Sequence, residues 1–185
     1  MTFGHLFRAS DLVLRIFKEY MSTKGNTQEI IRLSAQIYHQ LTQHAIQSYP
    51  SECCGLVLGP VNEKNRFSEI VPCENKQDEW HAVDPVQYPR TSQQAFLIDP
   101  KVLLDIHQKS RKEGKEIKLI YHSHVDVGAY FSEEDRRQAM MGHEPIYPNV
   151  VYLVLAAKDH RVDEAKLYAW SPAESEWVEA AWEVI

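Results

Sequence analysis

Two histidines and an acid in this 185-residue sequence have types and spacing that suit metal-dependent hydrolysis. His122 and His124 are separated by one residue, and Asp135 follows shortly after them. Two histidines and a carboxylate suit Zn²⁺, and three protein ligands leave a fourth coordination position open for water. The sequence therefore predicts a single catalytic zinc ion held by His122, His124 and Asp135.

Two further residues complete the predicted site. Glu52 begins an otherwise apolar run, ECCGLVLG, where a buried acid needs a specific reason. A zinc hydrolase also needs a carboxylate that takes a proton from water and passes it to the leaving amine. Ser132 precedes Asp135 by three residues and carries a hydroxyl that suits a developing oxyanion.

Each of these features also has a purely structural explanation. A lone His-x-His pair is more often a surface or core feature than a metal site, and Glu52 alone could be a surface acid at a strand edge. Ser132 and Asp135 match a helix capping box, in which the serine caps the helix and the acid reaches back. Capping and catalysis are compatible for Ser132, because different groups of the residue serve them.

The elements around these residues explain how they would be positioned. Residues 117–124 (IKLIYHSH) alternate as a β-strand, so both imidazoles would point to the same face. Ser123 would point to the opposite face in a structural role. A helix predicted from Ser132 to near Gly142 carries Asp135 in its first turn.

The rest of the chain predicts one sheet with helices around it. Ser34 caps a helix with an apolar face of Ile37, Leu41 and Ala45, and Pro50 ends it. A further helix is predicted from Asp99-Pro100 to Gly114, and strands are predicted at residues 30–33, 52–59, 70–71, 150–157 and 165–170. This order predicts an α+β or three-layer α/β fold, a mixed sheet flanked by helices, in a single domain of residues 29–185.

Composition narrows the class of protein. Residues 1–28 are interpreted as an N-terminal helical extension and a polar linker, without the features of a signal peptide. The net charge of −6 argues against a nucleic-acid partner, and no apolar run is long enough to span a membrane. Three cysteines give no disulfide framework, which favours the cytoplasm.

Several other residues are interpreted as structural. Cys53 and Cys54 suit small core positions, and a second zinc ion on Cys73 and His81 would lack a complete ligand set. Packing is the expected role of the tryptophans at 170, 177 and 182.

The polar segment of residues 74–95 is predicted to be a mobile loop that orders over substrate, the alternative being a permanently ordered loop.

The combined pattern resembles the JAMM, or MPN-plus, metalloprotease family. The family motif has an upstream Glu, then His-Ser/Thr-His, seven residues, Ser, two residues and Asp. Glu52 and the segment from His122 to Asp135 match it in full, and the resemblance covers roughly residues 29 to 170. Many bacterial members carry proline after the second histidine, where this chain has Val125, so we expect a freer loop there.

The resemblance implies a zinc-dependent peptidase or isopeptidase that cuts after the C-terminal glycine of a ubiquitin-like or sulfur-carrier protein. It assigns the general base to Glu52 and oxyanion stabilisation to Ser132. It leaves open a non-catalytic MPN scaffold, a general zinc peptidase, a linear or an isopeptide bond, and a homodimer. A zinc deaminase would need a Pro-Cys-x-x-Cys ligand pair, which this sequence lacks.

Overall fold

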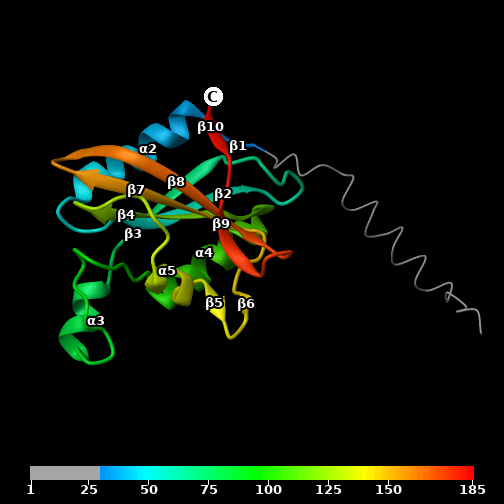
Figure 1. Cartoon of the computed structure of the whole chain (residues 1–185). Coiled ribbons are helices and arrows are strands. Elements are labelled where there is room, and N and C mark those ends of the chain that lie inside the picture. Colours follow the sequence, from blue (N-terminus) through cyan, green and yellow to red (C-terminus); the bar gives the residue numbers. More distant parts are fainter. Residues whose placement is uncertain (1–29) are drawn as a thin grey trace, which may run out of the picture.

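The computed structural model describes residues 30–185, so the predicted N-terminal extension lies outside the described residues. Its central element is a six-stranded mixed sheet in the order β3-β2-β4-β7-β8-β9 (Figure 1). Within this sheet, only the central β4–β7 pair is parallel. In chain order the strands of this sheet are β2 (Cys54–Pro60), β3 (Glu69–Cys73), β4 (Lys115–Val125), β7 (Val151–Lys158), β8 (Arg161–Ser171) and β9 (Glu176–Glu179).

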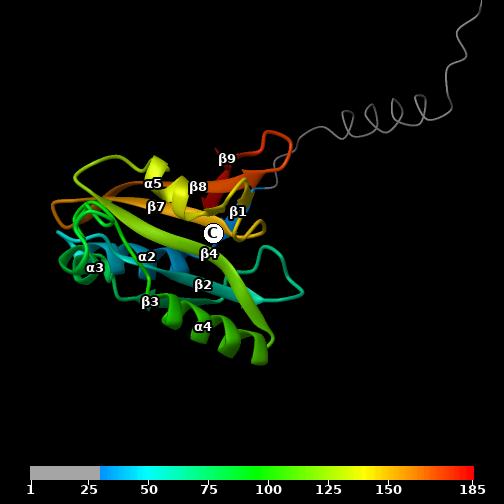
Figure 2. The same ribbon diagram turned by 90° about the horizontal axis from the view of Figure 1, so that it is seen from below.

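Helices cover both faces of the sheet, as Figures 1 and 2 show. The helix α2 (Ala35–Ser48) lies on one face, and α4 (Pro100–Lys112) and α5 (Glu133–Gln138) lie on the other. The predicted α+β fold, a mixed sheet flanked by helices, is therefore confirmed. None of the described helices is long and apolar enough to cross a membrane.

The N-terminal caps of α2 and α4 are the ones that the sequence predicted. The Ser34 hydroxyl accepts a hydrogen bond from the Ile37 amide, and the face of α2 that the pattern predicted is buried. The Asp99 carboxylate caps α4, and Pro100 takes its first position, where no amide hydrogen is needed. Gly114 follows this helix with a φ of 70°, a conformation that favours glycine.

Alternating side chains of β4 contribute to two separate cores. Leu119 and Tyr121 pack with α2 in one cluster, whereas Ile120 packs in the other cluster with residues of α4. His122 and His124 lie two and four residues after Ile120, so their side chains point to the same face of the sheet, the one that α4 and α5 cover. The strand thus explains why both histidines point to the same side.

On the opposite face from the histidines, Ser123 ties β4 to the residue that precedes β2. Its hydroxyl accepts a hydrogen bond of 2.8 Å from the Cys53 amide, and both residues are buried. The structural role predicted for Ser123 is confirmed. The chain's three cysteines are free and buried, which agrees with the core positions predicted for Cys53 and Cys54.

Replacing Ser123 with alanine should lower the free energy of unfolding by about 1–3 kcal/mol, because the Cys53 amide would stay buried without an acceptor. Urea denaturation followed by far-UV circular dichroism measures this change. Ser68→Ala is a matched control, since that hydroxyl bonds to a carbonyl at a less buried position. Equal stability of Ser123→Ala and the wild type would contradict the structural role.

The structure corrects the predicted ends of several elements. The helix α5 ends at Gln138 and not near Gly142, because β5 (Met140–Met141) turns back to pair with β6 (Glu144–Pro145). Gly142 has a φ of 65° and lies in the turn of this hairpin. β8 begins four residues earlier than predicted. The predicted strand at residues 30–33 is present as β1 (Ile31–Leu33), and it pairs in parallel with β10 (Trp182–Val184), a strand that the sequence did not predict.

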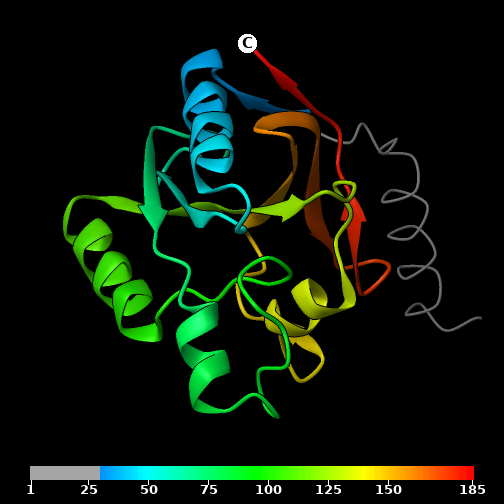
Figure 3. The ribbon, with the colours of Figure 1, turned by 90° about the vertical axis from the view of Figure 1, so that its left-hand side faces the viewer.

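Residues 74–95 contain the helix α3 (Gln77–Val83), so the prediction of an irregular loop is wrong. Figure 3 shows α3 away from the strands, with the loop that follows it lying between α3 and α5. The Asp78 carboxylate accepts hydrogen bonds from the amide and the hydroxyl of Ser92, and buried Gln77 donates to the Arg90 carbonyl. These bonds favour the ordered alternative, and closure over substrate stays a prediction.

Candidate metal centre and active site

The three predicted metal ligands converge on one point. His122 and His124 come from the end of β4, and Asp135 comes from the first turn of α5. The Nε2 atoms of the two histidines are 3.3 Å apart. His122 Nε2 lies 3.2 Å from Asp135 Oδ1, and His124 Nε2 lies 3.5 Å from Asp135 Oδ2.

These separations fit a zinc ion. Two ligand atoms that each lie ~2.0–2.1 Å from a tetrahedral zinc are separated from each other by about 3.3 Å. The two imidazole nitrogens therefore have the separation that one tetrahedral ion requires, and each lies at a similar distance from one of the two Asp135 oxygens. Among the described residues, this is the single group of three or more His, Cys, Asp or Glu side chains that could hold a metal ion.

Neighbouring groups orient the two imidazoles. His124 Nδ1 lies 3.1 Å from the Gly128 carbonyl oxygen, to which it donates, so in the neutral imidazole Nε2 is the nitrogen available to bind a metal. His122 is fully buried, and Phe96 stacks on its ring at 4.5 Å between centroids. Within residues 30–185, His122 Nδ1 is the one buried side-chain nitrogen or oxygen without a hydrogen-bond partner.

A capping box fixes Asp135. The Ser132 hydroxyl accepts from the Asp135 amide at 3.1 Å, and the Ser132 amide donates to Asp135 Oδ2 at 2.8 Å. The capping box predicted for Ser132 and Asp135 is therefore present, and it is compatible with Asp135 as a metal ligand. Because the Ser132 hydroxyl accepts in this box, its own hydrogen remains available to donate elsewhere.

The loop between the second histidine and α5 is held at Ala129. Glu164 accepts a hydrogen bond from the Ala129 amide at 2.9 Å, and the Tyr168 hydroxyl donates to the Ala129 carbonyl at 3.1 Å. These bonds fix the peptide that follows Gly128 and so the carbonyl that orients His124. The freer loop expected from Val125 stays a prediction.

Glu52 lies just before β2, on the same face as the histidines. Cys54 pairs with His122 across the antiparallel β2–β4 ladder, and continuing this register puts Glu52 opposite His124. The Glu52 residue is 5% exposed, and its main chain is held by the Ser92 carbonyl and the Asn75 amide group. The carboxylate lines the same cavity as His124, Ser132 and Asp135.

The two acids of the site differ electrostatically. Burial raises the pKa of Glu52 to about 9, the Asp135 charge adds to this shift, and Arg90 opposes it. Burial also acts to raise the pKa of Asp135, but the His122 charge and the hydrogen bonds to the carboxylate hold it well below its usual range. A divalent cation between the ligands would favour the charged form of Glu52, as a base requires.

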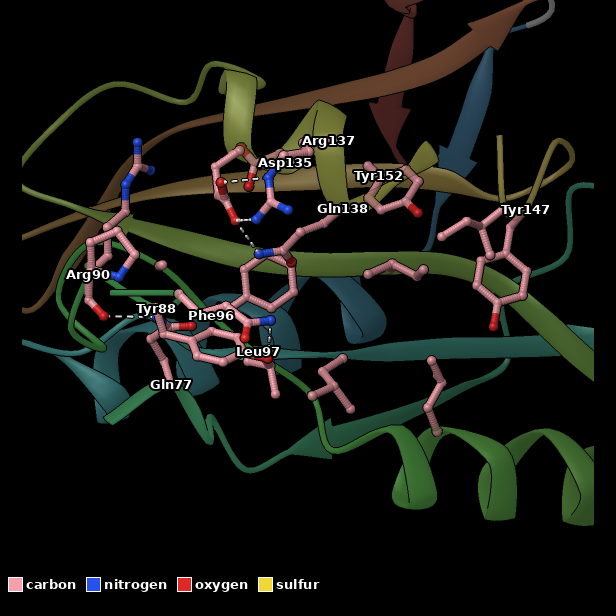
Figure 4. A pocket seen from close by; sticks show the side chains of 18 of the residues that line it. Gln77, Tyr88, Arg90, Phe96, Leu97, Asp135, Arg137, Gln138, Tyr147 and Tyr152 are labelled. Atoms are coloured by element: carbon pink, nitrogen blue, oxygen red, sulfur yellow. Dashed lines mark hydrogen bonds and ion pairs between the residues drawn. The ribbon is translucent and has the colours of Figure 1, made fainter. Parts of the chain in front are cut away.

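Two cavities meet at the predicted site. A polar cavity of about 490 Å³ contacts Glu52, His124, Ser132 and Asp135. A more apolar cavity of about 570 Å³ extends from Asp135 towards α4, and Figure 4 shows its labelled aromatic residues Tyr88, Phe96, Tyr147 and Tyr152.

Sequence reasoning missed three contributors to the site. Phe96 covers His122, Gly128 orients His124 through a main-chain carbonyl, and Arg90 contacts both cavities. Phe96 and Arg90 belong to or border the segment interpreted as a loop. No pattern in the sequence indicated them, because their contacts depend on how that segment folds back.

Known proteins resemble this chain along most of its length. Residues 34–170 match a family model described as prokaryotic homologs of the JAB domain. The chain is 22% identical over 148 residues to proteins named CysO-cysteine peptidase from Mycobacterium bovis and Mycobacterium tuberculosis. The match covers 80% of this chain and 88% of each relative.

Two solved structures share the fold. A solution structure from Desulfitobacterium hafniense superimposes with a TM-score of 0.62 at 23% identity, covering 84% of this chain and 93% of that one. A solution structure from Salinibacter ruber gives a TM-score of 0.55 at 21% identity, covering 84% of this chain and 90% of that one.

Proposed function

Because this chain belongs to the family of prokaryotic JAB-domain homologues, we propose that it is a zinc-dependent peptidase that cleaves after the C-terminal glycine of a ubiquitin-like or sulfur-carrier protein. The observation that carries the proposal is the convergence of His122, His124 and Asp135 beside buried Glu52. A scaffold without catalysis would have no need of this combination.

The chemistry divides among the residues of the site. A bound zinc ion would lower the pKa of a water molecule towards about 7 and polarise the substrate carbonyl. Glu52 accepts the proton of the attacking water and passes it to the leaving amine. The Ser132 hydroxyl donates to the carbonyl oxygen as negative charge develops there.

The substrate class rests on the named relatives and on the shape of the site. The mycobacterial relatives are named as peptidases of a CysO-cysteine species, and their match spans most of both chains. An extended tail that enters between residues 93–96 and α5 would bring its main chain close to the ligands. Glycine is expected beside the cut because a Cβ atom there would clash. The buried, reduced cysteines suit the cytoplasm.

Three substrates test the proposal. They are a ubiquitin-fold sulfur-carrier protein extended by one residue after Gly-Gly, its Gly→Ala variant at the cut, and the free tail peptide. The intact carrier should be cleaved fastest, and the Gly→Ala variant about 100-fold more slowly, because a small misplacement of the scissile bond has an effect of that size. The free peptide should also be poor, since it lacks the folded body that docks.

Mass spectrometry of the products gives the cut position and the rates. Cleavage of all three substrates at similar rates would identify a general zinc peptidase. Cleavage of none of them would contradict the proposed function itself.

A further inference from the structure

Arg90 lies beside the predicted active site and forms no ion pair with a described residue, although its charge acts on Glu52 and Glu134. Arginine keeps its charge at all physiological pH values and presents donors in a fixed fork. Most described arginines form an ion pair with a carboxylate of the same chain, namely Arg32, Arg66, Arg136, Arg137 and Arg161. Among residues 30–185, Arg90 and Arg111 form no such pair, and of the two only Arg90 contacts the polar cavity.

The main chain around Arg90 is held in place. Gln77 Nε2 donates to the Arg90 carbonyl at 2.8 Å, His81 Nδ1 lies 2.6 Å from the Tyr88 carbonyl, and the Ser92 amide donates to Asp78 at 2.7 Å. Figure 4 shows the guanidinium directed away from Tyr88 and Phe96, while the carbonyl faces Gln77. The charge is therefore presented from a fixed backbone, which lowers the entropy lost when it binds a ligand.

The carboxylates that line the polar cavity already have other roles. Asp126 accepts from the Tyr49 hydroxyl, and Glu134 accepts from Arg137 and Gln138. Asp135 faces the two histidines, and Glu52 is the proposed base. None of these carboxylates forms an ion pair with Arg90, which lines the same cavity, although the Arg90 charge acts on Glu52 and Glu134.

The position of Glu52 indicates which part of the substrate lies near Arg90. Glu52 and Arg90 line the polar cavity together, whereas the apolar cavity contacts Arg90 without Glu52. In the proposed reaction Glu52 gives its proton to the leaving amine, so the released residue lies in the polar cavity. If a single amino acid is released, its carboxylate is only two bonds from that amine.

We propose that Arg90 binds the free α-carboxylate of the residue released by the cut, so that the enzyme removes one C-terminal amino acid from its carrier protein. This inference rests on the proposed function and narrows it to a linear bond. A lysine isopeptide would carry its main-chain groups several carbon atoms away from the amine. A longer extension would offer a neutral amide in place of the carboxylate, which loses the bidentate, charge-assisted contact.

The test compares two forms of one substrate. A ubiquitin-fold sulfur-carrier protein is extended after Gly-Gly by a single cysteine, made either as the free acid or as the carboxamide. Both are cleaved by the zinc-loaded wild type, Arg90→Ala, Arg90→Lys and the control Arg111→Ala. Arg111 is also exposed and unpaired within the described part of the chain, but it lies in the last turn of α4.

The wild type and Arg111→Ala should cleave the acid roughly 10- to 100-fold more efficiently than the amide, the range for a charge-assisted hydrogen bond. Arg90→Ala should lose this preference, mainly because its KM for the acid rises, while its zinc content stays unchanged. Arg90→Lys should be intermediate, because it keeps the charge without the fork.

Two results would overturn the inference while leaving the proposed function intact. One is equal cleavage of acid and amide by the wild type. The other is a loss in Arg90→Ala that is equal for both substrates. If the zinc-loaded wild type cleaved neither form, the proposed function would fail and this inference would fall with it.

Discussion

Replacing Glu52 with glutamine should lower turnover by roughly 10²–10⁴ while zinc remains bound, because a positioned acid–base group contributes about that much. Glutamine keeps the size of the side chain but cannot accept the proton of water. Glu52 is 5% exposed, so bulk solvent has little access to the position and gives a weak substitute for the missing base. The kcat on the extended carrier protein and the zinc content of the same sample measure both effects.

Glu63→Gln is the matched control, since Glu63 is an exposed acid paired with Arg66 and lies near the start of β4, at the opposite end of the strand from the histidines. It should keep the wild-type rate. A near-normal kcat in Glu52→Gln would show that another residue is the base. Zinc loss in Glu52→Gln would instead make Glu52 part of the metal site.

Removing one metal ligand should have the second large effect. His122→Ala or His124→Ala leaves two ligands, and we expect zinc affinity and activity to fall together by more than about 100-fold, the upper range for losing an outer-shell partner. Activity measured against free zinc in a chelator buffer separates the two quantities. His39→Ala on the exposed face of α2 is the control and should behave like the wild type.

Asp135 needs a milder change because it also closes the capping box of α5. Asp135→Asn keeps an oxygen that can accept from the Ser132 amide but removes the negative charge. We therefore expect an intact helix with greatly weakened zinc binding. Full activity of Asp135→Asn without added zinc would contradict the role of Asp135 as a ligand.

The sequence alone predicted where the candidate residues lie when local geometry decides their positions. Alternation along a strand is a strict rule, so the shared face of His122 and His124 followed from their spacing. The capping signature of Ser132 and Asp135 is equally local and lies where it was expected. The convergence of these residues with Glu52 came from the resemblance to a known family motif.

Other features depend on contacts far apart in the sequence. The β1–β10 pair joins Ile31 to Trp182 at the two ends of the described chain, and neither short segment has a strong pattern of its own. The end of α5 was misjudged because Gly142 suits a hairpin turn as well as a helix end. Arg90 was overlooked because only the fold shows that it lines the polar cavity and forms no ion pair with a described residue.

The most direct test of the account is the zinc content of the purified protein. Inductively coupled plasma mass spectrometry on the wild type should find about one zinc ion per chain, because the site has a single set of three ligands. The double variant His122→Ala/His124→Ala, shown to be folded by circular dichroism, should contain almost none. Full zinc occupancy in the folded double variant would contradict the assignment of the metal centre.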